Sequence, residues 1–180
     1  MTRTTISTRR CDASSPETSN SDSQQSAIHL IRYRIIPILT VNRQGARPEP
    51  PLLPSDPVDA AKVIELCCHL KLDVELVARR VLPAAFFGAT ASDEVLATTE
   101  ADLDKGMKAV SRLFQGSPYA AGDSFTIADL YTFYTFGLSS PVIQKIYNKD
   151  LLAGYPQISA LMDELASRPS ISQVEADKAA

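Results

Sequence analysis

The side chains best suited to nucleophilic chemistry in this chain of 180 residues are its three cysteines, Cys11, Cys67 and Cys68. A thiolate is the reactive form, and nearby cations lower the pKa of a thiol. Arg9 and Arg10 precede Cys11, which makes it a candidate nucleophile, but the polar residues around it predict no fixed site. Cys67 and Cys68 point about 100° apart on a helix, and we expect them to be small core or interface residues.

The histidines and the cysteine spacing predict no metal centre. A structural zinc site needs a second pair of ligands, which the adjacent cysteines lack. Neither His29 nor His69 has an acid or a nucleophile that the sequence brings near it, so we expect both to be structural or exposed. An odd number of cysteines with two adjacent is a poor disulfide framework and suits a reducing compartment, which predicts a cytoplasmic protein.

Bulk composition excludes several classes of partner. The formal net charge is −3 and the sequence pI is about 5.4, which favours neither nucleic acid nor an anionic membrane. No apolar run approaches the roughly 20 residues of a membrane span. With 44% hydrophobic residues, the chain can build one domain with a core, together with a tail.

Composition divides the chain into three parts. Residues 1–25 are rich in Ser, Thr and Gln and cannot bury enough apolar area to offset the entropy of ordering, so we expect a disordered tail. Residues 26–54 hold an apolar segment, either a short helix or a strand that stops at Pro37, followed by a Pro-rich linker. Residues 55–180 carry helical signals throughout and predict an all-α domain.

This domain is expected to be a bundle of five or six helices with short connections. Asp56 is a good N-cap, and Pro57 suits the first helical position. Apolar side chains then recur at helical spacing: Val63, Leu66, Leu70 and Val74. The predicted helices are 57–81, one from Ser92 that stops at Gly116, one from Thr126, a short one over 142–148, one from Pro156 closed by Arg168, and a short polar one over 172–178. The helix after Thr126 is apolar on all sides, which places it at the centre.

The start of that central helix carries the most specific local signal. Thr126 can accept a hydrogen bond from a backbone N–H of the first turn, and Asp129 can reach back to the N–H of Thr126. This predicts a structural capping box, with Asp where Glu is more usual. Taken alone, the pair predicts only that a helix begins here.

Four stretches, in order, resemble the cytosolic-type glutathione S-transferases of bacterial kind. SPYAAGDSFTIAD at 117–129 is similar to the loop that leads into the capped core helix of that family. EPPLLPSDP at 49–57 resembles the junction between the family's two domains, and VELVARRVLPAAFFG at 74–88 resembles the first long helix of its C-terminal domain. DLLAGYP at 150–156 resembles the start of its last long helix. The resemblance covers about residues 47–178.

The resemblance implies a transferase that joins glutathione, as co-substrate, to hydrophobic electrophiles, and that can form a homodimer. In the family a thioredoxin-like N-terminal domain binds glutathione, whose γ-glutamyl group is held at a helix start. Donors around the sulfur lower its pKa and make it a nucleophile at neutral pH. No catalytic residue of this kind can be identified in the chain.

The chain departs from the family ahead of residue 47. Few residues precede the junction and they show no strand–helix–strand order, so we expect the thioredoxin-like domain to be missing or truncated. Gln25 and Ser26 resemble the γ-glutamyl motif, with one residue fewer before the apolar pair that follows. They are the candidate glutathione-binding residues. The alternative is a polar tail that meets an apolar segment.

Candidate substrate-binding residues lie at the end of the first long helix. In the family this region faces the glutathione domain and lines the pocket for the electrophile. Arg79, Arg80, Phe86 and Phe87 would supply the aromatic walls and cations that suit an apolar substrate joined to an anionic tripeptide. The alternative is that the phenylalanines are core and the arginines pair with acids such as Glu75.

Three functions remain open, and with them whether the chain is an enzyme. The first is a glutathione transferase with a complete site. The second is a non-catalytic helical binding or scaffold domain, which predicts a folded domain without affinity for glutathione. The third is a truncated product, which predicts exposed apolar surface where a missing domain would dock.

Overall fold

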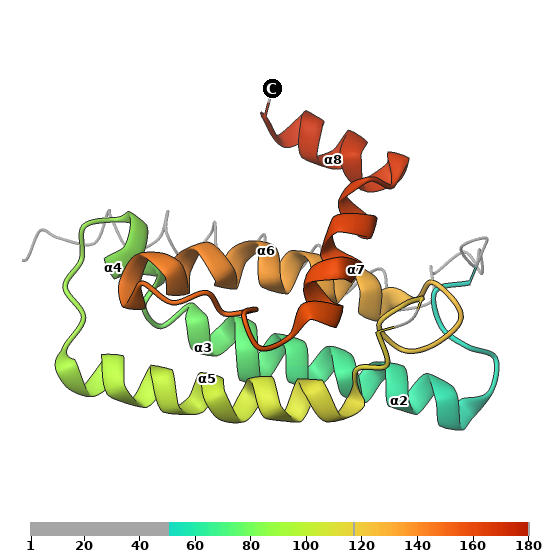
Figure 1. Cartoon of the computed structure of the whole chain (residues 1–180), viewed down its shortest axis with the longest axis horizontal. Helices are drawn as coiled ribbons and strands as arrows, with labels where there is room; N and C mark the ends of the chain where they lie inside the picture. The colour runs from blue at the N-terminus through green and yellow to red at the C-terminus, as the bar shows by residue number, and fades with distance from the viewer. Residues whose placement is uncertain (1–50, 117, 180) are drawn as a thin grey trace, which may run out of the picture. The chain divides into compact units, whose positions relative to one another are not determined.

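The computed structural model describes residues 51–116 and 118–179. The tail, the apolar segment and most of the linker expected over 1–54 lie outside these residues. The described helices are α2 (Pro57–Cys68), the π-helical stretch η1 (His69–Glu75), α3 (Leu76–Ala78), α4 (Leu82–Phe86), α5 (Asp93–Leu113), α6 (Ile127–Tyr147), α7 (Pro156–Ala166) and α8 (Pro169–Ala179). The all-α bundle expected from the sequence is confirmed (Figure 1).

One helical rod runs without a break through α2, η1 and α3. Its start is as expected, because Asp56 caps the helix by accepting from Val58 N at 2.9 Å and from Asp59 N at 3.0 Å. The predicted apolar stripe is buried in the core: Val63, Leu66, Leu70 and Val74. The rod ends at Ala78 rather than near residue 81, because the next backbone amides donate three residues back and form a tight turn. Helix α4 follows, with Pro83 in its first turn.

The wider π-helical winding of η1 stands where the sequence predicts a regular α-helix. The amide of Leu76, for example, donates to the carbonyl of Lys71. Helix α5 passes this stretch at very close range, since a Cβ built on Gly106 would lie 2.2 Å from the carbonyl oxygen of Asp73. Glycine is therefore the residue that fits at this crossing.

Helix α5 lies antiparallel beside the rod (Figure 1). Ser92 caps it by accepting from Val95 N at 3.3 Å, as the sequence predicts. Asp93 and Glu94 in its first turn complement the positive end of the helix dipole. The face turned toward the bundle buries three large apolar side chains: Leu103, Met107 and Val110.

Helix α6 occupies the centre and packs against α2, η1, α4 and α7, as its apolar composition predicts. The prediction of a separate helix over 142–148 is wrong, because α6 continues to Tyr147 with Pro141 inside it. Pro141 and Gly137, one turn earlier, are both exposed, so water can satisfy the carbonyl that loses its donor. Val142 and Ile143 are buried directly after the proline and hold the helix on the core.

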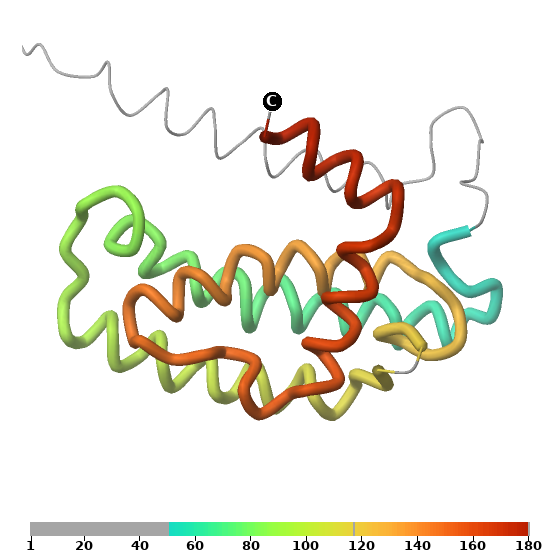
Figure 2. The backbone as a smooth tube through the Cα atoms, turned by 45° about the horizontal axis from the view of Figure 1, so that its top comes forward, coloured from blue at the N-terminus to red at the C-terminus, as the bar shows by residue number. Residues whose placement is uncertain are grey.

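Helix α7 starts at Pro156, as expected, and crosses α6 at a steep angle (Figure 1). It buries three side chains at helical spacing: Ile158, Leu161 and Leu165. Helix α8 starts at Pro169, earlier than the predicted position 172, and turns away from the bundle (Figure 2). Proline suits a first helical position because no donor is needed there. No helix among the described residues is both long and apolar enough to cross a membrane.

Candidate functional site

The carboxylate of Asp129 fastens the loop before α6 to the start of that helix. Its Oδ1 accepts from Ala120 N at 2.8 Å, and its Oδ2 accepts from Thr126 N at 2.7 Å and from Thr126 Oγ1 at 3.3 Å. Thr126 Oγ1 also accepts from Ala128 N at 3.3 Å. The capping box predicted from the sequence is therefore present. It fixes the conformation of the loop as well as the helix start.

Burial sets the protonation of the groups around this cap. Asp129 is fully buried, and the loss of hydration raises its pKa, while the amides of Ala120 and Thr126 act in the opposite direction. Burial also raises the pKa of the Cys67 thiol to about 12, and the charges of Cys68 and Asp129 add to this shift. A thiol with such a pKa is not a nucleophile at neutral pH. Asp129 and Cys67 therefore support the fold rather than chemistry.

Glu75 is the centre of a charge cluster on the rod. Its side chain is only 7% exposed, and its Oε1 accepts from Lys71 Nζ at 2.6 Å and from Arg79 Nε at 2.8 Å. The three residues follow one another at intervals of one turn, a spacing that favours ion pairs on a helix. The suggested pairing of an arginine with Glu75 is confirmed for Arg79. Lys71 is absent from the predicted site, although its spacing to Glu75 could have indicated it.

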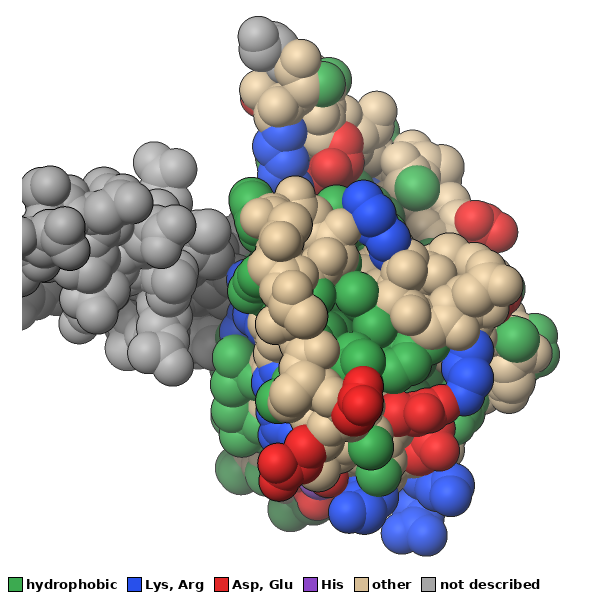
Figure 3. All heavy atoms as spheres, turned by 90° about the vertical axis from the view of Figure 1, so that its left-hand side faces the viewer, with side chains coloured by type: hydrophobic (Ala, Val, Ile, Leu, Met, Phe, Trp, Pro, Cys, Tyr) green, Lys and Arg blue, Asp and Glu red, His purple; other side chains and the backbone are tan. Residues whose placement is uncertain are grey.

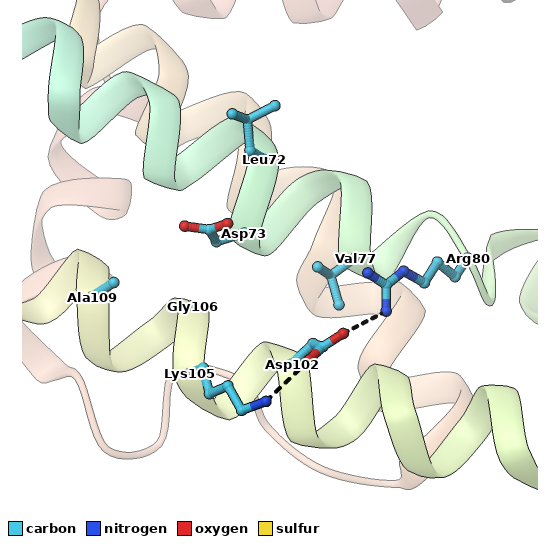
Figure 4. A pocket seen from close by; sticks show the side chains of 8 residues that line it. All are labelled: Leu72, Asp73, Val77, Arg80, Asp102, Lys105, Gly106 and Ala109. Atoms are coloured by element: carbon cyan, nitrogen blue, oxygen red, sulfur yellow. Dashed lines mark hydrogen bonds and ion pairs between the residues drawn. The ribbon is translucent and has the colours of Figure 1, made fainter.

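Arg80 points to a different surface. It lines a groove of about 390 Å³ between the rod and α5 (Figure 4). Its guanidinium lies 2.7 Å from Asp102 Oδ2, and Lys105 Nζ lies 3.4 Å from Oδ1 of the same carboxylate. Hydrogen bonds from Arg80 and Lys105 lower the pKa of Asp102. The structure thus separates Arg80 from Arg79, which the sequence places in one candidate site.

Phe86 and Phe87, at the end of α4, are 48% and 76% exposed. The alternative that these phenylalanines belong to the core is therefore wrong. Lys145, in the last turn of α6, places its Nζ 4.7 Å from the centre of the Phe86 ring. Figure 3 views the end of the bundle at which α4 lies, where hydrophobic side chains gather among charged ones. Exposed aromatic rings beside a cation are suited to bind apolar molecules that carry negative charge.

Tyr131, on α6, has a phenol whose pKa depends on its burial and on charged groups of the rod. Burial raises its pKa, and the charges of Cys67, Cys68 and Glu75 raise it further. The side chain is half-buried, on a helix that packs against η1, the stretch that carries Glu75. Tyr131 is expected in the sequence only as part of an apolar helix. Its raised pKa depends on how α6 packs against the rod, and no spacing in the sequence reports that.

His69 has a partner that the sequence does not predict. Its Nδ1 lies 2.6 Å from Asp73 Oδ2, one turn later on the rod, so the expectation that no acid is near it is wrong. The two side chains are 33% and 46% exposed, which makes them a surface pair. Cys68, beside His69, is exposed. Across 51–116 and 118–179, no group of three or more His, Cys, Asp or Glu side chains could hold a metal ion.

Comparison with known families identifies the bundle. A family model described as the glutathione S-transferase C-terminal domain matches residues 82–177, which is more than half of the chain. The match runs from α4 into α8 and includes the capped start of α6. This chain belongs to the glutathione S-transferase C-terminal domain family. The resemblance noted in the sequence is thereby confirmed.

Comparison with two relatives shows how much of the chain is similar to known proteins. A glutathione S-transferase of Pseudomonas putida is 36% identical over 129 residues, which are 72% of this chain and 59% of that protein. The crystal structure of a glutathione S-transferase from Methylobacterium radiotolerans, in complex with glutathione sulfonate, has a TM-score of 0.52 at 23% identity. That match covers 87% of this chain and 65% of the other, and it shows a shared fold. The chain therefore spans less than two thirds of the length of either relative.

The predicted site residues of this transferase domain do not form one cluster. Arg79 belongs to the Glu75 cluster, Arg80 to the groove beside α5, and Phe86 and Phe87 to the exposed end of α4. Lys145 lies over the ring of Phe86 without having been predicted. The remaining candidates, Cys11, Gln25 and Ser26, lie outside the described residues and stay predictions, and so does the expectation for His29.

Proposed function

We propose that this chain forms the electrophile-binding side of a glutathione S-transferase. In the reaction, the glutathione thiolate attacks an electrophilic carbon of a hydrophobic substrate, a carbon–sulfur bond forms, and the leaving group departs with its electron pair. The exposed pair Phe86 and Phe87, inside the segment that matches the family, is the observation that carries the proposal. Large aromatic side chains left in water at the end of a helix are typical of a ligand surface.

The residues of this surface have distinct roles in the proposal. Phe86 and Phe87 provide apolar contact for the electrophile, and Lys145 above the Phe86 ring favours electron-rich or anionic ring systems. Arg79 supplies a cation at the base of α4. Arg80 pairs with Asp102 in the groove beside α5 and is left out of this surface.

Glutathione itself requires a second set of residues. We assign Gln25 and Ser26 to the γ-glutamyl group, which such polar side chains and backbone amides can hold. Glutathione is the co-substrate in this scheme. The proposal includes a homodimer, which the resemblance to the family implies. It also includes a cytoplasmic location, because the chain has the cysteine pattern of a reducing compartment.

Retention on immobilised glutathione tests the proposal with the full chain. Specific retention, with elution by free glutathione, is the expected result, and the double variant Gln25→Ala, Ser26→Ala should lose it. Conjugation of glutathione to chlorodinitrobenzene, followed by the absorbance of the product, then tests the chemistry. Phe87→Ala should raise the KM for this aromatic electrophile and leave the retention on glutathione unchanged.

The contrary result is equally informative. A protein that circular dichroism shows to be helical, but that neither binds glutathione nor forms the conjugate, would exclude the transferase activity. It would leave two alternatives, the helical binding or scaffold domain and the truncated product.

A further inference from the structure

We infer that Lys71 and Arg79, held by Glu75, form an anion-binding subsite beside the α4 aromatics, which takes the carboxylate or sulfonate group of an aromatic ligand. The inference rests on the proposed function, since it names the chemical class of ligand for the same surface. It adds one residue, Lys71, to those predicted from the sequence.

The charge balance of the cluster is the first step. Lys71 and Arg79 both bond to Oε1 of Glu75, so two cations share a single carboxylate and one positive charge is left over. Glu75 is 7% exposed, whereas Lys71 and Arg79 are each 29% exposed. The carboxylate therefore lies beneath its partners, and the excess charge is presented at the surface of the rod.

The groove between the rod and α5 holds a second carboxylate that two cations share, but in a more exposed place. Arg80 and Lys105 both pair with Asp102 there, while Asp73, which also lines the groove, pairs with His69. The two cations of the groove are more open to water than those at Glu75, since Lys105 is 78% exposed and Arg80 is 45% exposed. Charges so exposed are screened by solvent and salt. The half-buried cations at Glu75 are screened less and bind an anion more strongly.

The surroundings of the cluster suit a ligand with an aromatic body. The chain turns directly after Arg79 into α4, which ends in the exposed rings of Phe86 and Phe87. A ligand with rings on α4 and an acidic group at Arg79 would use both surfaces.

Two fluorescent probes that differ by one group test this arrangement without glutathione. Anilinonaphthalene sulfonate carries the anion, and N-phenylnaphthylamine has the same ring system without it. In the full chain, Arg79→Gln should weaken binding of the sulfonate probe about tenfold, the loss of one charge-assisted contact, and leave the neutral probe within about twofold. Arg80→Gln, the neighbouring arginine, is the matched control and should change neither probe.

A second variant should change the affinity for the sulfonate probe in a direction that a purely structural role of Glu75 cannot produce. Glu75→Gln removes the competing carboxylate at nearly constant volume, so the sulfonate probe should bind several-fold more tightly. If Glu75 only held the helix together, the same change would weaken or abolish binding. Circular dichroism checks each variant for folding. Should Arg79→Gln not fold, Lys71→Gln replaces it, with a loss of several-fold expected for the sulfonate probe alone.

The source of the anion is decided by competition. Displacement of the bound sulfonate probe by free glutathione assigns the subsite to a carboxylate of glutathione. No displacement assigns it to an acidic group on the second ligand. The inference is overturned if Arg79→Gln and Arg80→Gln weaken the sulfonate probe equally, or if the neutral probe loses as much affinity as the charged one. Because no glutathione is needed for the first titrations, this failure is distinct from failure of the transferase activity.

Discussion

At the start of α6, the carboxylate of Asp129 is fully buried and every bond it accepts comes from its own helix and the loop before it. At the end of the rod, the carboxylate of Glu75 is nearly as buried, but its partners are the half-buried cations Lys71 and Arg79. The chain then continues to Phe86 and Phe87, whose side chains are exposed to solvent. Both regions place an acid inside a helical bundle, and they differ in what surrounds it.

The difference shows how one fold can divide stability and recognition between two helix ends. A polar group whose bonds all close on neighbouring backbone fixes one conformation and offers nothing to a ligand. A polar group that holds cations at the surface leaves part of their bonding capacity for another molecule. Substitutions at the first region should therefore act on folding, and those at the second on binding.

The largest effect on stability is expected at Asp129. Asp129→Ala removes the acceptor of the Ala120 and Thr126 amides, and two buried donors without partners should lower the free energy of unfolding by about 3 kcal/mol. Urea denaturation followed by circular dichroism measures the loss. Asp123→Ala, an exposed acid in the same loop, is the control and should lie within about 0.5 kcal/mol of the wild type. Equal losses at both positions would remove the distinction between the two helix ends.

The next largest effect is expected where α5 crosses η1. Gly106→Ala would place a methyl group 2.2 Å from the backbone oxygen of Asp73, so the helices must shift, with a loss of about 1–3 kcal/mol. Gly137→Ala is the matched change on α6, where a Cβ meets nothing within 4 Å. It should stabilise the protein by about 0.5–1 kcal/mol through helix propensity. Thermal unfolding of the two variants, which should shift in opposite directions, checks this.

A smaller, pH-dependent effect is expected at the groove. Because Arg80 and Lys105 lower the pKa of Asp102 in the folded state, this carboxylate adds stability at neutral pH. That contribution is present above the unfolded pKa of about 3.9 and is lost as the pH falls through the lower folded pKa. Asp102→Asn should therefore lower the melting temperature slightly at pH 7 and not at strongly acidic pH. Added salt should shrink the difference, and a difference that persists in salt would contradict an exposed pair.

The smallest effect on stability is expected at Phe87. Its ring is 76% exposed, so Phe87→Ala should change the free energy of unfolding by less than about 0.5 kcal/mol. The same change should weaken binding of a neutral naphthylamine probe, because the ring is part of the proposed ligand surface. Val174→Ala, at an apolar residue of α8 that is 43% exposed, is the control for unspecific binding of the probe. A strong loss of stability at Phe87 would mean that the α4 end belongs to the core.

Local chemistry made the helix starts predictable. Asp56, Ser92 and the pair Thr126 and Asp129 cap helices in the structure because a cap depends on residues within one turn of one another. The separate helix predicted over 142–148, directly after Pro141, is wrong for the opposite reason. Whether a proline breaks a helix depends on whether the freed carbonyl meets water and whether the next residues are buried, and both are properties of the packed bundle.

The candidate site was less predictable than the fold. The spacing of Lys71, Glu75 and Arg79 is visible in the sequence, and so is that of His69 and Asp73. The winding of η1 is not, because it arises where two helices meet, and it decides which arginine turns to which surface. Lys145 reaches the Phe86 ring only across a contact between two helices, so no pattern along the chain could have assigned it.

The winding of η1 has a consequence for comparing this chain with its relatives. A π-helical turn takes up about one residue more than an α-helical turn, and one residue corresponds to about 100° of rotation around the helix axis. A relative that lacks a residue within 69–75 would carry its later charges to another side of the rod, even with the same letters in the same order. A one-residue gap in that part of an alignment therefore indicates that the residues after the gap face another side of the rod. Arginines that align after such a gap need not have the same role.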